Sequence, residues 1–109
     1  MRKFSPKIIM KTESGELRIA QAAVKDLILR GTAGTAGLRR IKSRLKQSAE
    51  GLEINLTCQV EENSDFTKVS MKVQETVRHT IEQYSGIKVK EVKVLIQPVA
   101  IGTYPAWRR

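Results

Sequence analysis

The stretch LEINLTCQV at residues 52–60 decides the fold class. Its residues alternate without a break between apolar and polar types. An alternation with a period of two is typical of a β-strand that buries one face and leaves the other in water. The segment LRRIKSRLK at residues 38–46 alternates in the same way, and the turn sequence SAEG at residues 48–51 separates the two. The pattern predicts a hairpin, and the inner face of its second strand is expected to consist of Leu52, Ile54, Leu56, Cys58 and Val60.

Two segments carry a helical period instead. Between residues 66 and 84, apolar side chains recur at steps of three and four, and either Ser64 or Asp65 is suited to cap the first turn. Gly86 is expected to end this helix. A second, shorter helix is predicted over residues 20–30, with Gly31 as its stop. The expected buried stripe of the longer helix is Phe66, Val69, Val73, Val77, Ile81 and Tyr84.

Strands near both ends of the chain complete the expected fold. Residues 7–12 suit a strand, and residues 16–19 are extended again after a turn. Residues 87–97 suit a last strand, in which the parity of the apolar positions changes and so requires a bulge near Lys90 and Glu91. The predicted order is β-α-β-β-α-β. The predicted class is α+β: a two-layer sandwich in which two helices pack on one face of a mainly antiparallel sheet.

The length of 109 residues allows one domain, and we predict a single domain over residues 1–109. Its core is expected to span about residues 7–98, with a short N-terminal arm over 1–6 and a C-terminal tail over 99–109. No apolar run approaches the ~20 residues of a membrane span, and the basic start of the chain lacks the uninterrupted apolar region of a signal peptide. The single cysteine, Cys58, is typical of a reducing compartment. The expected location is therefore the cytoplasm.

The formal net charge is +9, and the whole excess lies in the first part of the chain. Residues 1–46 hold twelve Lys or Arg and three Asp or Glu, whereas residues 47–109 hold eight of each kind. A surface that is basic on one side attracts polyanions such as RNA, DNA, anionic lipid or an acidic protein face. A charged surface that only keeps the protein soluble is the alternative.

The densest group of basic residues lies on the strand predicted over residues 38–46, where no acidic residue separates them. Its even-numbered members should project from the sheet face that the helices leave open, where they could contact an anionic partner. None of the predicted strands carries an aromatic residue on which bases could stack, and a solvated edge strand guarded by charge is the alternative. In the tail, an aromatic side chain could anchor a partner. The candidate interaction surface is Arg39, Arg40, Lys42, Arg44, Lys46, Lys93 and Trp107.

The segment RGTAGTAGLRR at residues 30–40 contains Gly-x-x-Gly twice, a pattern that clamps nucleic-acid phosphates in KH domains. In those domains the loop lies between two helices, whereas here it joins a helix to a strand. It also lacks the Lys-Ser/Thr ending and the following helix that a P-loop requires. The pattern favours a flexible connection, and an anion-binding loop is the alternative.

No group of residues in the sequence is arranged for catalysis. The serines have no histidine near them in any motif, and Cys58 lies on the expected apolar face of its strand. The single histidine, His79, and the single cysteine do not have the spacing of metal ligands. We therefore predict no enzyme activity, no catalytic or metal-binding residue and no cofactor.

Three stretches resemble a known family. They are GELRIAQAAVKDLI at residues 15–28, VSMKVQETVRHTIEQYSGIKVKEVKVLIQPV at residues 69–99, and the pair Gly37-Leu38 at the start of the second predicted strand. Together they resemble the alkaline shock protein family, envelope-stress proteins found mainly in Gram-positive bacteria. The chain departs from the usual pattern in its glycine repeat and in the segment EENSD at residues 61–65.

The resemblance implies a non-enzymatic cytoplasmic protein that is tied to stress of the cell envelope. Members of the family cluster at the membrane by binding a membrane-anchored relative. We therefore expect a protein-interaction module that associates with itself as a homo-oligomer or binds such a relative at the inner face of the cell membrane. A small basic RNA- or DNA-binding domain that uses the same surface is the alternative.

Overall fold

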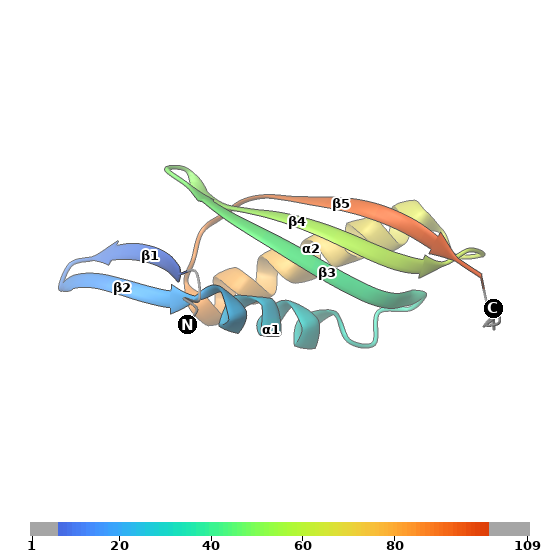
Figure 1. Ribbon diagram of the computed structural model, residues 1–109, viewed down its shortest axis with the longest axis horizontal. Coiled ribbons are helices and arrows are strands. Elements are labelled where there is room, and N and C mark those ends of the chain that lie inside the picture. Colours follow the sequence, from blue (N-terminus) through green and yellow to red (C-terminus); the bar gives the residue numbers. More distant parts are fainter. Residues whose placement is uncertain (1–6, 101–109) are drawn as a thin grey trace, which may run out of the picture.

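The computed structural model describes residues 7–100. This part of the chain forms five strands and two helices in the order β-β-α-β-β-α-β, so the predicted α+β class is confirmed (Figure 1). The elements are β1 (Lys7–Thr12), β2 (Gly15–Ala20), α1 (Gln21–Thr32), β3 (Leu38–Ser48), β4 (Gly51–Glu61), α2 (Phe66–Ser85) and β5 (Val89–Val99).

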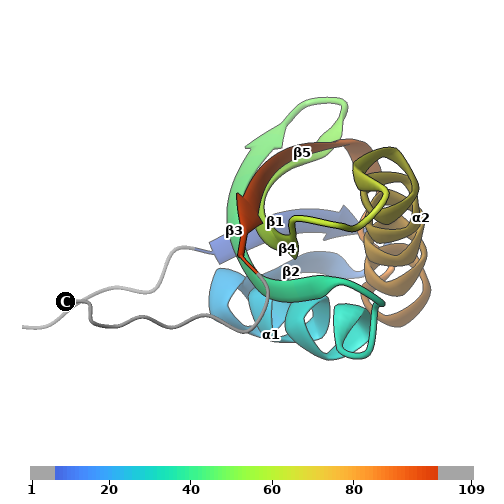
Figure 2. The same cartoon turned by 90° about the vertical axis from the view of Figure 1, so that its right-hand side faces the viewer.

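Three strands form the main sheet, in the order β3-β4-β5. β3 and β4 pair antiparallel through the predicted hairpin, whereas β4 and β5 pair parallel. The prediction of a mainly antiparallel sheet is therefore wrong for the β4–β5 pair. The reason is that α2 carries the chain back along β4, so that β5 starts at the same end of the sheet as β4. Figure 2 shows the main sheet as a curved layer with both helices on its concave side.

The N-terminal strands form a separate two-stranded sheet and not a strand of the main sheet, so the predicted order is wrong at this end. The turn after Thr12 closes the hairpin. The Thr12 hydroxyl donates to the carbonyl of Gly15 at 3.3 Å and accepts from the N–H of Ser14 at 3.2 Å. Because the turn brings β2 back along β1, the first strand finds its partner within its own hairpin.

Two kinds of contact, apolar packing and hydrogen bonding, hold this hairpin against the rest of the fold. Ile8 is fully buried in the core. The side-chain amide of Gln47, on β3, bonds to both backbone groups of Ile9: its Oε1 accepts from the N–H at 3.0 Å and its Nε2 donates to the carbonyl at 2.5 Å. This side chain takes the place of a ladder of backbone hydrogen bonds between the hairpin and the main sheet. The hairpin extends past the main sheet (Figure 1).

The predicted bulge in the last strand is confirmed. Leu52 pairs with Val89 and the next residue, Glu53, pairs with Glu91, which leaves Lys90 without a partner on β4. The extra residue brings apolar side chains on both sides of the bulge to the same buried face of β5. All five residues predicted for the inner face of β4 also lie in the core, each no more than 2% exposed.

α2 begins at a predicted cap and ends at the predicted glycine. The Asp65 carboxylate accepts from the N–H of Lys68 at 3.1 Å, and Gly86 follows the last turn with a φ of 75°. Most of the predicted stripe is buried, but Tyr84 is 74% exposed and its place in the stripe is wrong. The helical period gives the direction of a side chain but not how far the neighbouring elements extend along the helix.

Replacing Asp65 by alanine is expected to lower the free energy of unfolding by about 1 kcal/mol, because the N–H of Lys68 loses its acceptor. Asp65→Asn keeps an oxygen acceptor and should stay within about 0.5 kcal/mol of the wild type. Urea unfolding followed by circular dichroism measures both variants. Equal losses in the two would contradict the capping role.

Gly31 lies inside α1, which continues to Thr32, so the prediction that this glycine ends the helix is wrong. Packing between the helices requires the glycine instead. A Cβ atom at residue 31 would lie 2.8 Å from Oγ1 of Thr80 on α2. Glycine therefore lets the two helices approach at this point.

The rest of the glycine segment is a compact connection between α1 and β3. The N–H groups of Ala33, Thr35 and Leu38 each donate to a backbone carbonyl three or four residues earlier, at 3.1 Å. An amide that donates within its own segment is not available to an anion. The geometry therefore favours the connection over an anion-binding loop.

Candidate interaction surface

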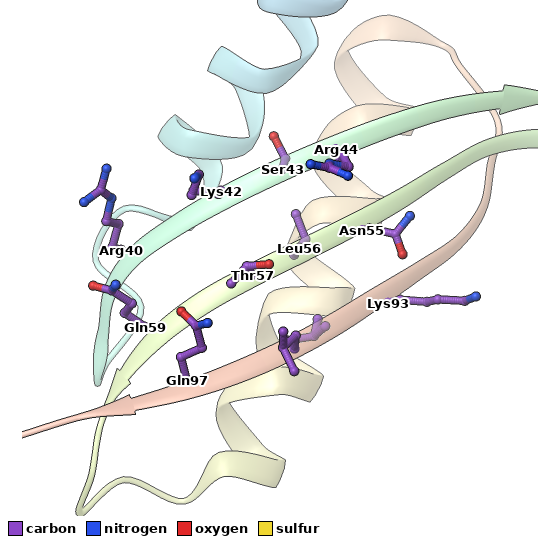
Figure 3. A pocket seen from close by; sticks show the side chains of 12 residues that line it. Arg40, Lys42, Ser43, Arg44, Asn55, Leu56, Thr57, Gln59, Lys93 and Gln97 are labelled. Atoms are coloured by element: carbon purple, nitrogen blue, oxygen red, sulfur yellow. The ribbon is translucent and has the colours of Figure 1, made fainter.

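The convex face of the main sheet is open, because both helices pack on the other side (Figure 2). A shallow groove runs across this face over β3, β4 and β5 (Figure 3). We call it the basic groove. It is lined by Arg40, Lys42, Ser43, Arg44, Asn55, Leu56, Thr57, Gln59, Lys93, Val94, Leu95 and Gln97.

The register of the three strands arranges the outward side chains of the groove in rows. Each row starts with a basic residue on β3 and continues with a polar residue on β4. Neighbouring rows are about 6.8 Å apart, the distance between alternate residues of a strand. The rows are Arg40–Gln59–Gln97, Lys42–Thr57–Leu95 and Arg44–Asn55–Lys93.

The lining of the groove carries charge of one sign. Four of the residues are basic and none is acidic. Among residues 7–100, the ion pairs of the structure involve neither Arg40 nor Lys42 nor Arg44. Cationic groups held side by side on an open face create a positive potential that a carboxylate or phosphate would offset.

Acidic residues lie at the end of the groove that is nearest to the turn between β3 and β4. The ammonium group of Lys90 lies 3.1 Å from a carboxylate oxygen of Glu50 and 3.3 Å from one of Glu53, and these carboxylates raise the pKa of Lys90. Lys93 pairs with Glu91 at 3.3 Å. The unpaired positive charge of the groove is therefore concentrated on β3.

The structure brings together only part of the predicted surface. Arg40, Lys42, Arg44 and Lys93 share the groove. Arg39 lies at an irregularity in the β3–β4 register and pairs with Glu61 at 3.5 Å, outside the groove. Lys46 is exposed in the next row, opposite Glu53. Trp107 lies outside the described residues.

Leu95 is a residue of the groove that the sequence analysis missed. It is 58% exposed and lies in the middle row, beside Thr57. The signal for it was present, because Leu95 has the same parity as Lys93 and Gln97 on a strand whose apolar face carries the other parity. An exposed leucine among cationic and amide groups adds an apolar contact to the groove.

Cys58 lies on the buried side of β4, on the face opposite the groove. Burial raises the pKa of its thiol to about 11. Its burial confirms its predicted place in the core. A thiol that stays protonated at neutral pH is also a poor nucleophile. In residues 7–100, no three His, Cys, Asp or Glu side chains come together in the way a metal ion would need.

Several solved structures share the fold at low sequence identity. The metal-bound C-terminal domain of the CzcD transporter from Thermotoga maritima matches with a TM-score of 0.56 at 10% identity, over 78% of this chain and 95% of that chain. A MamM CTD matches with a TM-score of 0.54 at 12% identity, over 72% of this chain and 99% of that chain. The zinc form of a MamM CTD variant matches with a TM-score of 0.55 at 15% identity, over 76% and 90%. At these identities the likeness shows the fold alone.

No curated protein matches the chain by sequence. Over residues 7–100, neither helix combines the length and the apolar character that a membrane crossing needs. A family model matches residues 43–101, which is more than half of the chain and runs from β3 through α2 to the end of β5. The match confirms the resemblance noted in the sequence. The chain therefore belongs to the alkaline shock protein 23 family, which has a cell envelope-related function.

Proposed function

We propose that this protein is a non-enzymatic protein-interaction module and that its basic groove binds an acidic surface of a partner protein. The observation that carries the proposal is the lining of the groove, with four basic and no acidic residues on a face that the two helices leave open. Charge of one sign on an open face steers an oppositely charged partner to it and speeds association.

The chemistry of the groove supports binding and not catalysis. Its hydroxyl groups, on Ser43 and Thr57, have no histidine or carboxylate among the other lining residues to act as a general base. The remaining polar groups are amides and cations, which bind carboxylates but do not by themselves activate a nucleophile.

The composition of the groove favours a protein partner over a nucleic acid. Single-strand binders of the sheet type stack bases on aromatic side chains, and no aromatic residue lines this groove. Leu95 instead offers an apolar contact in the middle row. A partner segment that carries carboxylates and an apolar side chain can use both features, whereas a phosphate chain uses only the charge.

A membrane-anchored relative is the partner that we propose for this groove. Such a partner fits a family with a cell envelope-related function. It would bring the chain to the inner face of the membrane through a contact on the sheet, without a membrane-crossing segment in the described part of the chain.

Reversing two groove charges, Arg40→Glu with Arg44→Glu, is expected to weaken binding to polyglutamate by at least roughly ten-fold, because both side chains lie on β3 where the unpaired charge is concentrated. Fluorescence anisotropy of a labelled polyglutamate peptide at about 0.15 M salt measures the affinity. The same titration is carried out with a single-stranded oligonucleotide of equal charge.

The control is Lys68→Glu with Lys72→Glu, two exposed residues of α2, which changes the net charge by the same amount on another part of the surface. We expect this variant to bind polyglutamate within about two-fold of the wild type. An equal loss in both double variants would show that net charge and not the groove binds the peptide. Tighter binding of the oligonucleotide than of polyglutamate would favour the nucleic-acid alternative.

A further inference from the structure

One edge of the main sheet is formed by β5, and α2 occupies the backbone groups along the first part of that edge. The amide of Gln74 donates to the carbonyl of Val92 at 3.0 Å. At Val89, the carbonyl accepts from Arg78 at 2.7 Å and the N–H donates to Glu82 at 2.9 Å. Side chains of one helix therefore take the place of a neighbouring strand over this part of β5.

The second part of the edge has no such cover. The carbonyl of Val99 accepts from the N–H of Glu62, which follows β4, at 2.9 Å. Because backbone groups alternate in direction along a strand, the odd-numbered residues here face β4 and the even-numbered residues face outward. Within residues 7–100, no side chain bonds to the outward groups of Val94 and Ile96. Pro98, also outward, has no N–H to offer, which suits an edge position.

We infer that this edge pairs with the same edge of a second copy of the chain, antiparallel and around a two-fold axis at Leu95. In this register Val94 lies opposite Ile96 of the second copy. The N–H and the carbonyl of each residue then bond to those of the other, as in a hydrogen-bonded antiparallel pair. An isologous contact of this kind uses one self-complementary patch on both copies.

The ends of the open segment are complementary in the same register. Val92 lies opposite Pro98 of the second copy. The carbonyl of Val92 is already bound by Gln74, and Pro98 lacks the N–H that would compete for it. The N–H of Val92 remains free to donate to the carbonyl of Pro98. The carbonyl of Val92, which is already bound, thus lies opposite a residue that has no N–H to donate. This match is the reason for choosing a second copy, and not an unrelated strand, as the partner.

Side chains on the outer face select the same register. Leu95, 58% exposed, lies on the axis and would pack against its own copy. Lys93 would lie opposite Gln97, whereas an axis at Lys93 would place two ammonium groups side by side. Pairing in this way joins the two basic grooves into one surface. The inference rests on the strand edge and on Leu95, Lys93 and Gln97, which also line the groove, and it does not depend on which ligand the groove binds.

Cysteine cross-linking tests the axis. The wild-type chain has only Cys58, which is fully buried. Leu95→Cys should form a disulfide-linked dimer under mild oxidation, because residues opposite each other in a non-hydrogen-bonded pair have Cα atoms about 4.5 Å apart, within reach of a disulfide. The matched control is Lys42→Cys, an exposed position on the same sheet face but on β3. It should form no disulfide-linked dimer over the same time.

Two further variants test the register. Lys93→Cys alone and Gln97→Cys alone should not cross-link, because each residue would lie about 13 Å from its own copy across the axis. A mixture of the two variants should form the heterodimer, because residues 93 and 97 lie opposite each other. Cross-linking of Lys93→Cys alone, with none in the mixture, would overturn the proposed register.

Sedimentation velocity of the full chain tests the association without a covalent bond. Leu95→Lys should raise the dissociation constant of the dimer by at least roughly ten-fold, since it replaces an apolar contact by two like charges on the axis. Leu29→Lys, at another exposed leucine on α1, should leave it unchanged. A wild-type chain that stays monomeric at every soluble concentration, or a Lys42→Cys variant that cross-links as fast as Leu95→Cys, would overturn the inference. If the chain does not bind polyglutamate but Leu95→Cys still cross-links, the proposed function is contradicted and the inferred dimer is not.

Discussion

Replacing Gly51 by alanine should lower the free energy of unfolding by about 4 kcal/mol. Gly51 follows the β3–β4 turn with a φ of 137°, a conformation that L-residues rarely adopt, and this strain costs about 1–3 kcal/mol. A Cβ atom there would also lie 2.9 Å from the carbonyl oxygen of Lys88 and 3.1 Å from the nitrogen of Lys90. These are backbone atoms just before β5 and at its bulge, which cannot rotate away, so overpacking adds about 1–3 kcal/mol.

Gly15→Ala is the matched control for this prediction. Gly15 has a φ of 141° and lies in a turn built like that of Gly51: the hydroxyl of Thr12 donates to the Gly15 carbonyl as that of Ser48 donates to the Gly51 carbonyl. No atom lies within 4 Å of a Cβ placed at Gly15. This variant should therefore lose only the cost of the strain, about 2 kcal/mol. Urea unfolding measures both variants. Equal losses in the free energy of unfolding would show that the backbone next to β5 can accommodate a Cβ atom at residue 51.

These two glycines show what the sequence can and cannot predict. Both turns were expected from their polar residues and a glycine between extended segments, because a turn depends on a few neighbouring residues. The alternation of residues 52–60 and the cap at Asp65 are equally local, and both are confirmed. Of the two glycines, only Gly51 lies against the backbone next to β5. The turn sequence does not predict this contact, because it does not determine where β5 lies in the sheet.

The errors have the same origin. The alternation of β5 predicts a strand but not its direction, which follows from the return of the chain through α2. Gly31 has the local features of a helix stop, yet its position is set by Thr80, almost fifty residues later in the chain. Tyr84 has the helical phase of the stripe, but its exposure depends on where other elements end. In each case a contact between distant segments overrides the local preference.

The candidate surface was predictable to the extent that it follows one strand. The alternation of β3 predicts that Arg40, Lys42 and Arg44 point to the same side. The rows that complete the groove depend on the register across three strands, and register comes from pairing. Leu95 was missed although its shared parity with Lys93 and Gln97 is visible in the sequence, and only its place in the middle row depends on the pairing of β5 with β4.

Cys58 should make the stability of the fold fall at alkaline pH. Burial raises the pKa of its thiol from an ordinary value near 9.0 to about 11 in the folded chain. Between these two values the unfolded chain loses the thiol proton while the folded chain keeps it, so the unfolded state binds fewer protons. Stability therefore decreases as the pH rises through this window, and is not affected by this thiol below it. The loss amounts to about 2 kcal/mol near the upper end of the window.

Comparison with Cys58→Ala isolates this contribution, because every other residue is common to both chains and its contribution cancels in the difference. At neutral pH the variant should be less stable than the wild type, by about 1–2 kcal/mol, since a buried side chain is shortened. Near pH 10.5 the two chains should be equally stable, or the variant should be the more stable one, because only the wild type loses the thiol contribution. Urea unfolding at both pH values, with a reductant present, measures the difference.

A difference between the two chains that stays constant with pH would mean that the thiol ionises equally in both states. The groove should not follow this change while the chain stays folded, because Cys58 lies between Ile41 and Ile96 on the inner face of the three strands and keeps its proton there over most of the window. A buried thiolate would place a charge among apolar side chains and loosen the packing that holds the rows in register. Binding of polyglutamate by the folded wild type and by the folded Cys58→Ala variant should therefore change equally over this alkaline range, and an earlier loss in the wild type would mean that the thiol ionises within the fold.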